Sequence, residues 1–213
     1  MIGKLLMIGA LPLLAADPNR VTNSQTIPFP GDGTLRFERF SGEIHIQAWD
    51  RPEIEIAFSK STYVPKLRLR LDAVQMKAEP RGNDVVISTT APRCKDIQVE
   101  YQVHAPRNIT LAIDHNTGGV YVTGIAGDIH AKVRNGQITL RLPETGVYAI
   151  DAKSTIGRVY SDFDGTQKPT WLFGEGFAKP ADSARKLDLR IGFGDILILK
   201  TPYRSSELRQ QSQ

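Results

Sequence analysis

Short alternations of apolar and polar residues, each introduced by a glycine, recur along this 213-residue chain. Side chains of a β-strand point alternately to its two faces, so such runs predict strands with one buried face. The repeats begin at Gly119, Gly127, Gly136, Gly146 and Gly157, and the pattern also occurs at Gly42 and Gly194. A recurring unit of turn and strand predicts a repetitive β architecture.

The chain outside the central repeats is patterned in the same way. We expect strands at Leu35–Phe37, Ile44–Ile46, Ile54–Ile56, Leu67–Leu71, Val85–Ile87 and Ile97–Val103, after a polar stretch from Asp17 to Gln25. No window carries a helical period over three turns. The predicted fold class is therefore all-β.

Two all-β architectures fit this spacing. Short, regularly spaced strands are typical of an antiparallel β-sandwich, whereas a glycine-led repeat favours a β-solenoid, like a parallel β-helix, whose turns stack over a shared apolar stripe. The inward pairs predicted to stack are Val120/Val122, Ile129/Ala131 and Ile138/Leu140. We expect the solenoid, joined or capped by an N-terminal β-sheet region (Thr26–Val103), with the sandwich as the alternative.

The two ends of the chain differ from the body. Residues 1–16 have the pattern of a secretory signal peptide, with Lys4 before the apolar run Leu5–Leu14 and two alanines after it. No later apolar run approaches the length of a membrane-spanning helix. We predict a signal peptide at 1–16, a single β-repeat domain at 26–203 and a disordered tail at 204–213.

The net charge and the cysteine content of the chain bear on its cellular location. The net charge is +4, which favours anionic surroundings. Cys94 is the only cysteine, so no internal disulfide can form. An exported protein without disulfides fits a bacterial periplasm, cell surface or extracellular space better than a eukaryotic secretory route.

Three segments resemble a bacterial family of adhesin-like domains of unknown function, built from β-strand repeats. Gly42–Ile56 is similar to its first hairpin, Tyr101–Pro106 with Gly119–Leu142 to its body, and Leu187–Ile198 to its closing strand pair. The resemblance implies a solenoid-like fold and a place in the bacterial cell envelope. It supplies no catalytic residue, and the segment Asp162–Ala184 departs from it.

Chemical motifs of enzymes are absent from the sequence: it contains no nucleophile elbow, phosphate loop, zinc-binding His-Glu-x-x-His or dinucleotide fingerprint. His45 and His130 occupy the same place in their repeats, and we expect both on outward faces. The carboxylates near the turns are interpreted as turn formers and edge charges. We predict no cofactor, no metal and no catalytic residue.

Two segments stand out as candidate ligand sites. In the predicted strand Lys66–Leu71, alternation would place Lys66, Arg68 and Arg70 on one outer face, where they could follow an anionic polymer; a solvated face or a protected edge would explain the same pattern. In Asp162–Ala184, aromatic residues that include Trp171 and Phe173 could stack on a sugar or cap an open end of the core.

The sequence therefore predicts a non-enzymatic, exported envelope protein that acts as a structural or adhesion module. A binding module for anionic glycan or lipid, using Lys66, Arg68, Arg70, Trp171 and Phe173, is the first alternative. A polysaccharide-acting enzyme is the second, and it requires two carboxylates that converge in a groove. The expected partner is an anionic envelope polymer, a glycan or another protein, and not nucleic acid.

Overall fold

The computed structural model describes residues 19–90, 96–169, 173–182 and 185–201. These residues form fourteen β-strands and one 3-10 helix, which confirms the all-β class. The elements are β1 (Arg20–Pro28), β2 (Thr34–Ser41), β3 (Glu43–Trp49), β4 (Glu53–Thr62), η1 (Pro65–Ala73), β5 (Gln75–Arg81), β6 (Asp84–Thr90), β7 (Ile97–Pro106), β8 (Thr110–Thr123), β9 (Ile129–Pro143), β10 (Tyr148–Ile156), β11 (Val159–Ser161), β12 (Thr166–Pro169), β13 (Glu175–Lys179) and β14 (Arg185–Thr201). The predicted signal peptide and tail, together with Cys94 and Trp171, lie outside the described residues.

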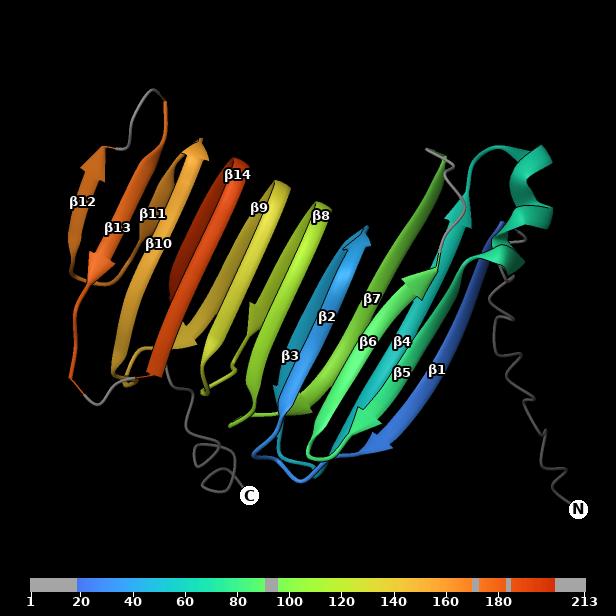
Figure 1. Cartoon of the computed structure of the whole chain (residues 1–213), viewed down its shortest axis with the longest axis horizontal. Coiled ribbons are helices and arrows are strands. Elements are labelled where there is room, and N and C mark those ends of the chain that lie inside the picture. The colour runs from blue at the N-terminus through green and yellow to red at the C-terminus, as the bar shows by residue number, and fades with distance from the viewer. Residues whose placement is uncertain (1–18, 91–95, 170–172, 183–184, 202–213) are drawn as a thin grey trace, which may run out of the picture.

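All fourteen strands belong to one mixed sheet that does not close on itself. Three long strands, β8, β9 and β14, bend midway. Their first halves pair in parallel with β2 and β10 in layer A, which β6 and β5 extend at one end and β13 and β12 at the other. Their second halves pair in parallel with β3 and β11 in layer B, which β7, β4 and β1 extend. Figure 1 shows the layers along the long axis, with β1 and η1 at one end and β12 and β13 at the other.

A column of glycines forms the bend between the two layers. The glycines are Gly42, Gly118, Gly136, Gly157 and Gly194, with φ from 127° at Gly42 to 147° at Gly136. A Cβ placed on Gly136 would lie 1.9 Å from the carbonyl oxygen of Gly118, and one on Gly194 would lie 1.8 Å from that of Gly136. The backbones of successive bends therefore touch, and only glycine combines this φ with this contact.

We call a stretch of chain that runs through layer A, bends at a glycine and continues through layer B a bent unit. Each glycine-led repeat corresponds to one half of a bent unit. The six residues predicted to point inward are all buried. However, Val120 lies in register with Ile138 in layer B, whereas Ile129 lies in register with Leu111 in layer A. The predicted stacking of all three pairs on one another is therefore wrong. Every second glycine of the repeat lies at or beside the bend from layer A to layer B, and the turns that contain Gly127 and Gly146 return the chain to layer A.

The order of strands in space departs from their order in the chain at β14. This last strand inserts between β9 and β10 and is parallel to both. The unit formed by β10 and β11 therefore joins β9 in the sheet through β14. The architecture is a large, open, mixed sheet folded into two layers.

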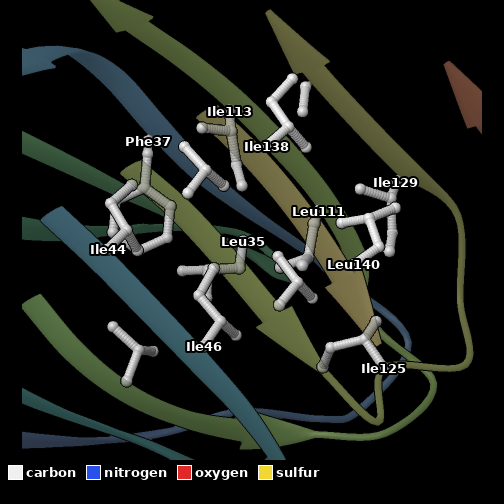
Figure 2. Packing of buried hydrophobic residues seen from close by; sticks show 14 of the residues in the cluster. Leu35, Phe37, Ile44, Ile46, Leu111, Ile113, Ile125, Ile129, Ile138 and Leu140 are labelled. Atoms are coloured by element: carbon white, nitrogen blue, oxygen red, sulfur yellow. The ribbon is translucent and has the colours of Figure 1, made fainter. Parts of the chain in front are cut away.

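Buried apolar side chains from both layers fill the space between them. Figure 2 shows side chains from several strands interdigitating there: Leu35 and Phe37 from β2, Ile44 and Ile46 from β3, Leu111 and Ile113 from β8, and Ile129, Ile138 and Leu140 from β9. Each is at most 3% exposed. β-Branched and leucine side chains repeat at matching registers, so neighbouring bent units place similar apolar side chains next to one another in the core between the layers.

Residues 65–73, which include the predicted strand Leu67–Leu71, form η1 instead. Pro65 stands in its first turn, where the fixed φ of proline favours a helix. The segment contains no β-branched residue, and lysine, leucine and arginine favour helix over strand. Leu71 is buried but Leu69 is 88% exposed, so the alternation does not mark a buried face. No helix in the described segments is long and apolar enough to cross a membrane.

At the N-terminal end, β1 begins at Arg20, within the polar stretch where no strand was predicted. At the other end, the segment Asp162–Ala184 contains the β12–β13 hairpin, which lies beside β10. Phe163 and Phe177 are each 5% exposed and belong to the core. The ring of Phe163 meets that of Tyr148 edge-on, with centroids 5.5 Å apart. These contacts support the capping role predicted for this segment.

Candidate functional site

The predicted site residues on η1 do not form a row. Lys66, Arg68 and Arg70 are all exposed. A 3-10 helix has three residues per turn, so side chains two apart point in different directions. The prediction of three cations on one strand face is therefore wrong.

Phe173, the described aromatic residue of the predicted site, is 76% exposed and forms an isolated β-bridge with Ile156. It lies just before β13, at the opposite end of the molecule from η1 (Figure 1). The fold does not bring Phe173 together with Lys66, Arg68 and Arg70.

A different set of cations gathers on the outer face of layer A. Lys132 of β9 lies in register with Arg190 of β14, which lies in register with Lys153 of β10. Neighbouring strands are about 4.8 Å apart, so these three cations occupy adjacent positions. Arg134 follows on the same face of β9. We call Lys132, Arg134, Lys153 and Arg190 the basic cluster.

The basic cluster is only partly neutralised by neighbouring acids. The Arg190 guanidinium pairs with the carboxylates of Asp151 at 2.6 Å and Asp188 at 3.0 Å. Lys132, Arg134 and Lys153 are exposed and form no ion pair with the residues that the structure describes. Like charges directly opposite one another destabilise a sheet. Such destabilising arrangements often occur at binding sites, where a ligand supplies the opposite charge.

The cluster surrounds a hollow of about 560 Å³. Gly192 contributes no side chain to the lining, and a Cβ there would lie 2.6 Å from the carbonyl oxygen of Arg134. Asp114 is the one carboxylate among the described residues that line this hollow. Asp114, Asp151 and Asp188 offset part of the charge of the four cations, and the exposed Lys132, Arg134 and Lys153 leave a positive surface suited to carboxylate, sulfate or phosphate groups.

Two carboxylates lie side by side in an adjacent hollow of about 680 Å³. Asp151 and Asp188 are in register on β10 and β14, so their backbones are about 4.8 Å apart. Retaining glycosidases hold two carboxyl groups roughly 5 Å apart. Both side chains are at least half exposed and both pair with Arg190. A glycosidic general acid instead needs surroundings that keep it protonated. The geometry favours a salt-bridge network over an acid-base pair.

The two histidines with matching places in the repeat are on opposite sides of the molecule. His45 lies in β3 of layer B, and His130 lies in the first half of β9 in layer A. Both are on outer faces, as predicted, and they cannot share a ligand. Within the described ranges, no group of three His, Cys, Asp or Glu residues could hold a metal ion.

The outer face of layer B carries stacked rings. His45 stacks on Tyr121 with centroids 4.6 Å apart, and His104 stacks on Trp49 at 5.2 Å. The Arg51 guanidinium lies 4.9 Å from the Trp49 ring centroid. Since these rings already contact one another, they leave less free ring surface for a sugar, and layer B is the weaker candidate.

Several carboxylates near the turns hold neighbouring strands. Asp128 accepts the Lys186 N–H at 2.8 Å, and Asp195 accepts the Arg158 N–H at 2.8 Å. Asp162 accepts the Lys200 N–H at 3.0 Å. These bonds agree with the interpretation of such acids as turn and edge residues.

Comparison with known proteins identifies a shared fold. The crystal structure of a "putative cell adhesion protein" from Clostridium sporogenes aligns over 85% of this chain and 100% of its own, with a TM-score of 0.51 and 14% identity. "Putative adhesins" from Parabacteroides merdae and Bacteroides fragilis align at TM-scores of 0.27 and 0.25, with 9% and 10% identity, over 67% and 85% of this chain and 69% and 99% of theirs. No family model and no curated protein matches the chain. Its structural neighbours are thus bacterial proteins named as adhesins, and the Clostridium protein shares its fold.

Proposed function

We propose that this chain is a non-enzymatic, exported adhesion module of a bacterial cell envelope that binds an acidic polysaccharide. Residues 1–16 would direct export, residues 26–203 would form the module and residues 204–213 a disordered tail. In this proposal the five bent units, β2–β3, β8, β9, β14 and β10–β11, act as a short β-solenoid that presents one broad face to the ligand.

The observation that carries the proposal is the register of Lys132, Arg190 and Lys153 on three adjacent strands. Their positive charges run across layer A, and the hollow around Gly192 leaves room for a negatively charged group between them. A linear polymer with repeated carboxylate or sulfate groups can meet several of these cations at once. A lipid surface would instead favour cations beside exposed apolar side chains, which the lining of this hollow does not offer.

The test is binding of acidic and neutral polysaccharides to the wild-type chain and to a variant carrying Lys132→Gln, Arg134→Gln and Lys153→Gln. Each exposed charge pair contributes about 0.5 kcal/mol, and 1.4 kcal/mol is a factor of ten. We expect affinity for an acidic polysaccharide to fall about tenfold. Wild-type binding should also weaken as salt increases, because the charges are exposed.

The matched control is Lys66→Gln, Arg68→Gln and Arg70→Gln, which removes the same charge from η1. We expect this variant to bind as well as the wild type. If it loses affinity while the first variant keeps it, the ligand binds at η1, where the sequence placed the site. Binding of anionic vesicles but not of acidic glycans would assign the cluster to a lipid surface instead. An absence of glycan binding by the wild-type chain would refute the proposal.

Polysaccharide cleavage is the second candidate function. It rests on the observation that Asp151 and Asp188 lie side by side on the neighbouring strands β10 and β14. Release of reducing ends from a bound polysaccharide, abolished by Asp151→Asn, would support it. We expect no release.

A further inference from the structure

Within the described residues the sheet has four edges: β5 and β12 in layer A, and β1 and β11 in layer B. An unpaired edge can recruit another strand, so proteins protect edges by short length, charge, proline or cover. β12 has four residues and includes Lys168 and Pro169. β5 contains Lys77 and Pro80. Both edges of layer A are therefore protected.

The β11 edge of layer B is covered by side chains from the neighbouring hairpin. The Glu175 carboxylate accepts the backbone N–H of Val159 at 3.1 Å, and the Gln167 amide donates to the Val159 carbonyl at 3.0 Å. With only three residues, β11 has little backbone left to offer.

β1 is not protected in these ways along most of its length. It has nine residues, pairs with β4 without a register shift, and contains neither lysine nor acid. Its one charged side chain, Arg20, extends over its own sheet to the Glu100 carboxylate of β7, at 2.9 Å. The Thr22 hydroxyl lies 2.8 Å from that of Ser59 on β4. Both side chains point away from the free edge and leave it open.

The backbone groups on that edge belong to the even-numbered residues. At one end the Asn19 carbonyl accepts the Thr62 N–H at 3.2 Å, and at the other the Phe29 N–H donates to the Pro52 carbonyl at 3.0 Å. Bonding to a neighbour alternates along an antiparallel strand. Odd-numbered residues of β1 therefore bond to β4, and even-numbered ones direct N–H and C=O outward.

We propose that two copies of this chain pair through their β1 edges, antiparallel, about a two-fold axis at Ser24. Residues at equal distances on either side of Ser24 have chemically similar side chains, except for Arg20 and Pro28 at the ends of the strand. The two-fold axis would oppose Val21 with the partner's Ile27, Thr22 with the partner's Thr26, Asn23 with the partner's Gln25, Ser24 with the partner's Ser24, and Arg20 with the partner's Pro28.

This symmetry identifies a second copy, rather than an unrelated strand, as the occupant. A two-fold interface must be complementary to itself, and here apolar residues meet apolar ones, amides meet amides and hydroxyls meet hydroxyls. No like charges oppose each other, because Arg20 faces a proline. Pro28 lies at an even position, so its missing N–H is absent only from the outermost pair. Layer B would continue from one copy into the other, which is independent of glycan binding by layer A.

The first test compares the molar mass of the full-length chain, by light scattering over a dilution series, with that of Ser24→Pro and Ser24→Ala. Proline at Ser24 removes an outward N–H and leaves the bonds to β4 in place, whereas alanine keeps the N–H. We expect dimers for the wild type and Ser24→Ala, and monomers with an unchanged circular dichroism spectrum for Ser24→Pro. A dimer that survives Ser24→Pro would overturn the proposal.

The second test detects a weak dimer and fixes its register. In the proposed pairing the two Ser24 Cα atoms are about 5.5 Å apart, within the range of a disulfide. Ser24→Cys should therefore form a covalent dimer on oxidation. Asn23→Cys, whose symmetry mate is displaced along the strand, and the wild type, with its single Cys94, should not. Absence of a cross-link specific to Ser24→Cys would refute the two-fold pairing.

Discussion

Replacing Gly136 by alanine should remove a large part of the stability of this protein. Gly136 has a φ of 147°, a conformation that costs other residues about 1–3 kcal/mol. The new Cβ would also lie 1.9 Å from the Gly118 carbonyl oxygen, and overpacking costs about 1–3 kcal/mol more. Because the contacting atom is backbone in the neighbouring unit, no side-chain rotation relieves it. We expect a loss of about 4 kcal/mol in urea unfolding, from a total that is about 5–15 kcal/mol in most domains.

The matched control for this prediction is Gly82→Ala. Gly82 also has a positive φ, 64°, but a Cβ there would meet nothing within 4 Å. Alanine at this position should lower the free energy of unfolding by only about 1 kcal/mol, the cost of a left-handed backbone conformation for a residue with a Cβ. Equal losses for the two variants would show that the glycine column does not depend on close backbone contact between the bent units.

Most strand positions could be predicted from alternation because most strands bury one face, and all six residues expected to point inward do so. The largely exposed strands β1 and β12 carry no such signal. What could not be predicted is which strand lies beside which. A glycine-led run of this length has the same pattern whether it forms a full turn or half of a bent unit. Likewise, nothing local to residues 185–201 indicates that β14 lies between β9 and β10.

The candidate site could not be predicted from the sequence either, because it also depends on which strands are neighbours. Lys66, Arg68 and Arg70 form a pattern visible in one segment, but Pro65 and a helix-favouring composition made that segment η1. The basic cluster joins positions 132, 153 and 190, which are distant in sequence. Only the register of three strands brings them together, so no local motif could have revealed the site.

The buried phenol of Tyr101 should make the fold sensitive to alkali. Tyr101 is fully buried between the layers, against the rings of Phe37 and Phe58, and its hydroxyl bonds to that of Thr89 on β6. Burial raises the pKa of Tyr101 to about 12, although the bond to Thr89 lowers it. Since the folded pKa exceeds the unfolded value near 10, the neutral phenol contributes stability that is complete below pH 10. That contribution is lost as pH rises from 10 through 12.

Comparing the wild type with Tyr101→Phe separates this effect from the titration of other residues. At neutral pH the variant should be about 1 kcal/mol less stable, because it lacks the hydrogen bond to Thr89. By pH 12 the wild type should have lost about 2 kcal/mol relative to the variant, given about 1.4 kcal/mol per pKa unit, so that the order of stability reverses. Urea unfolding of both proteins from pH 8 to 12 measures this difference. Parallel pH profiles would mean that unfolding does not change the pKa of Tyr101.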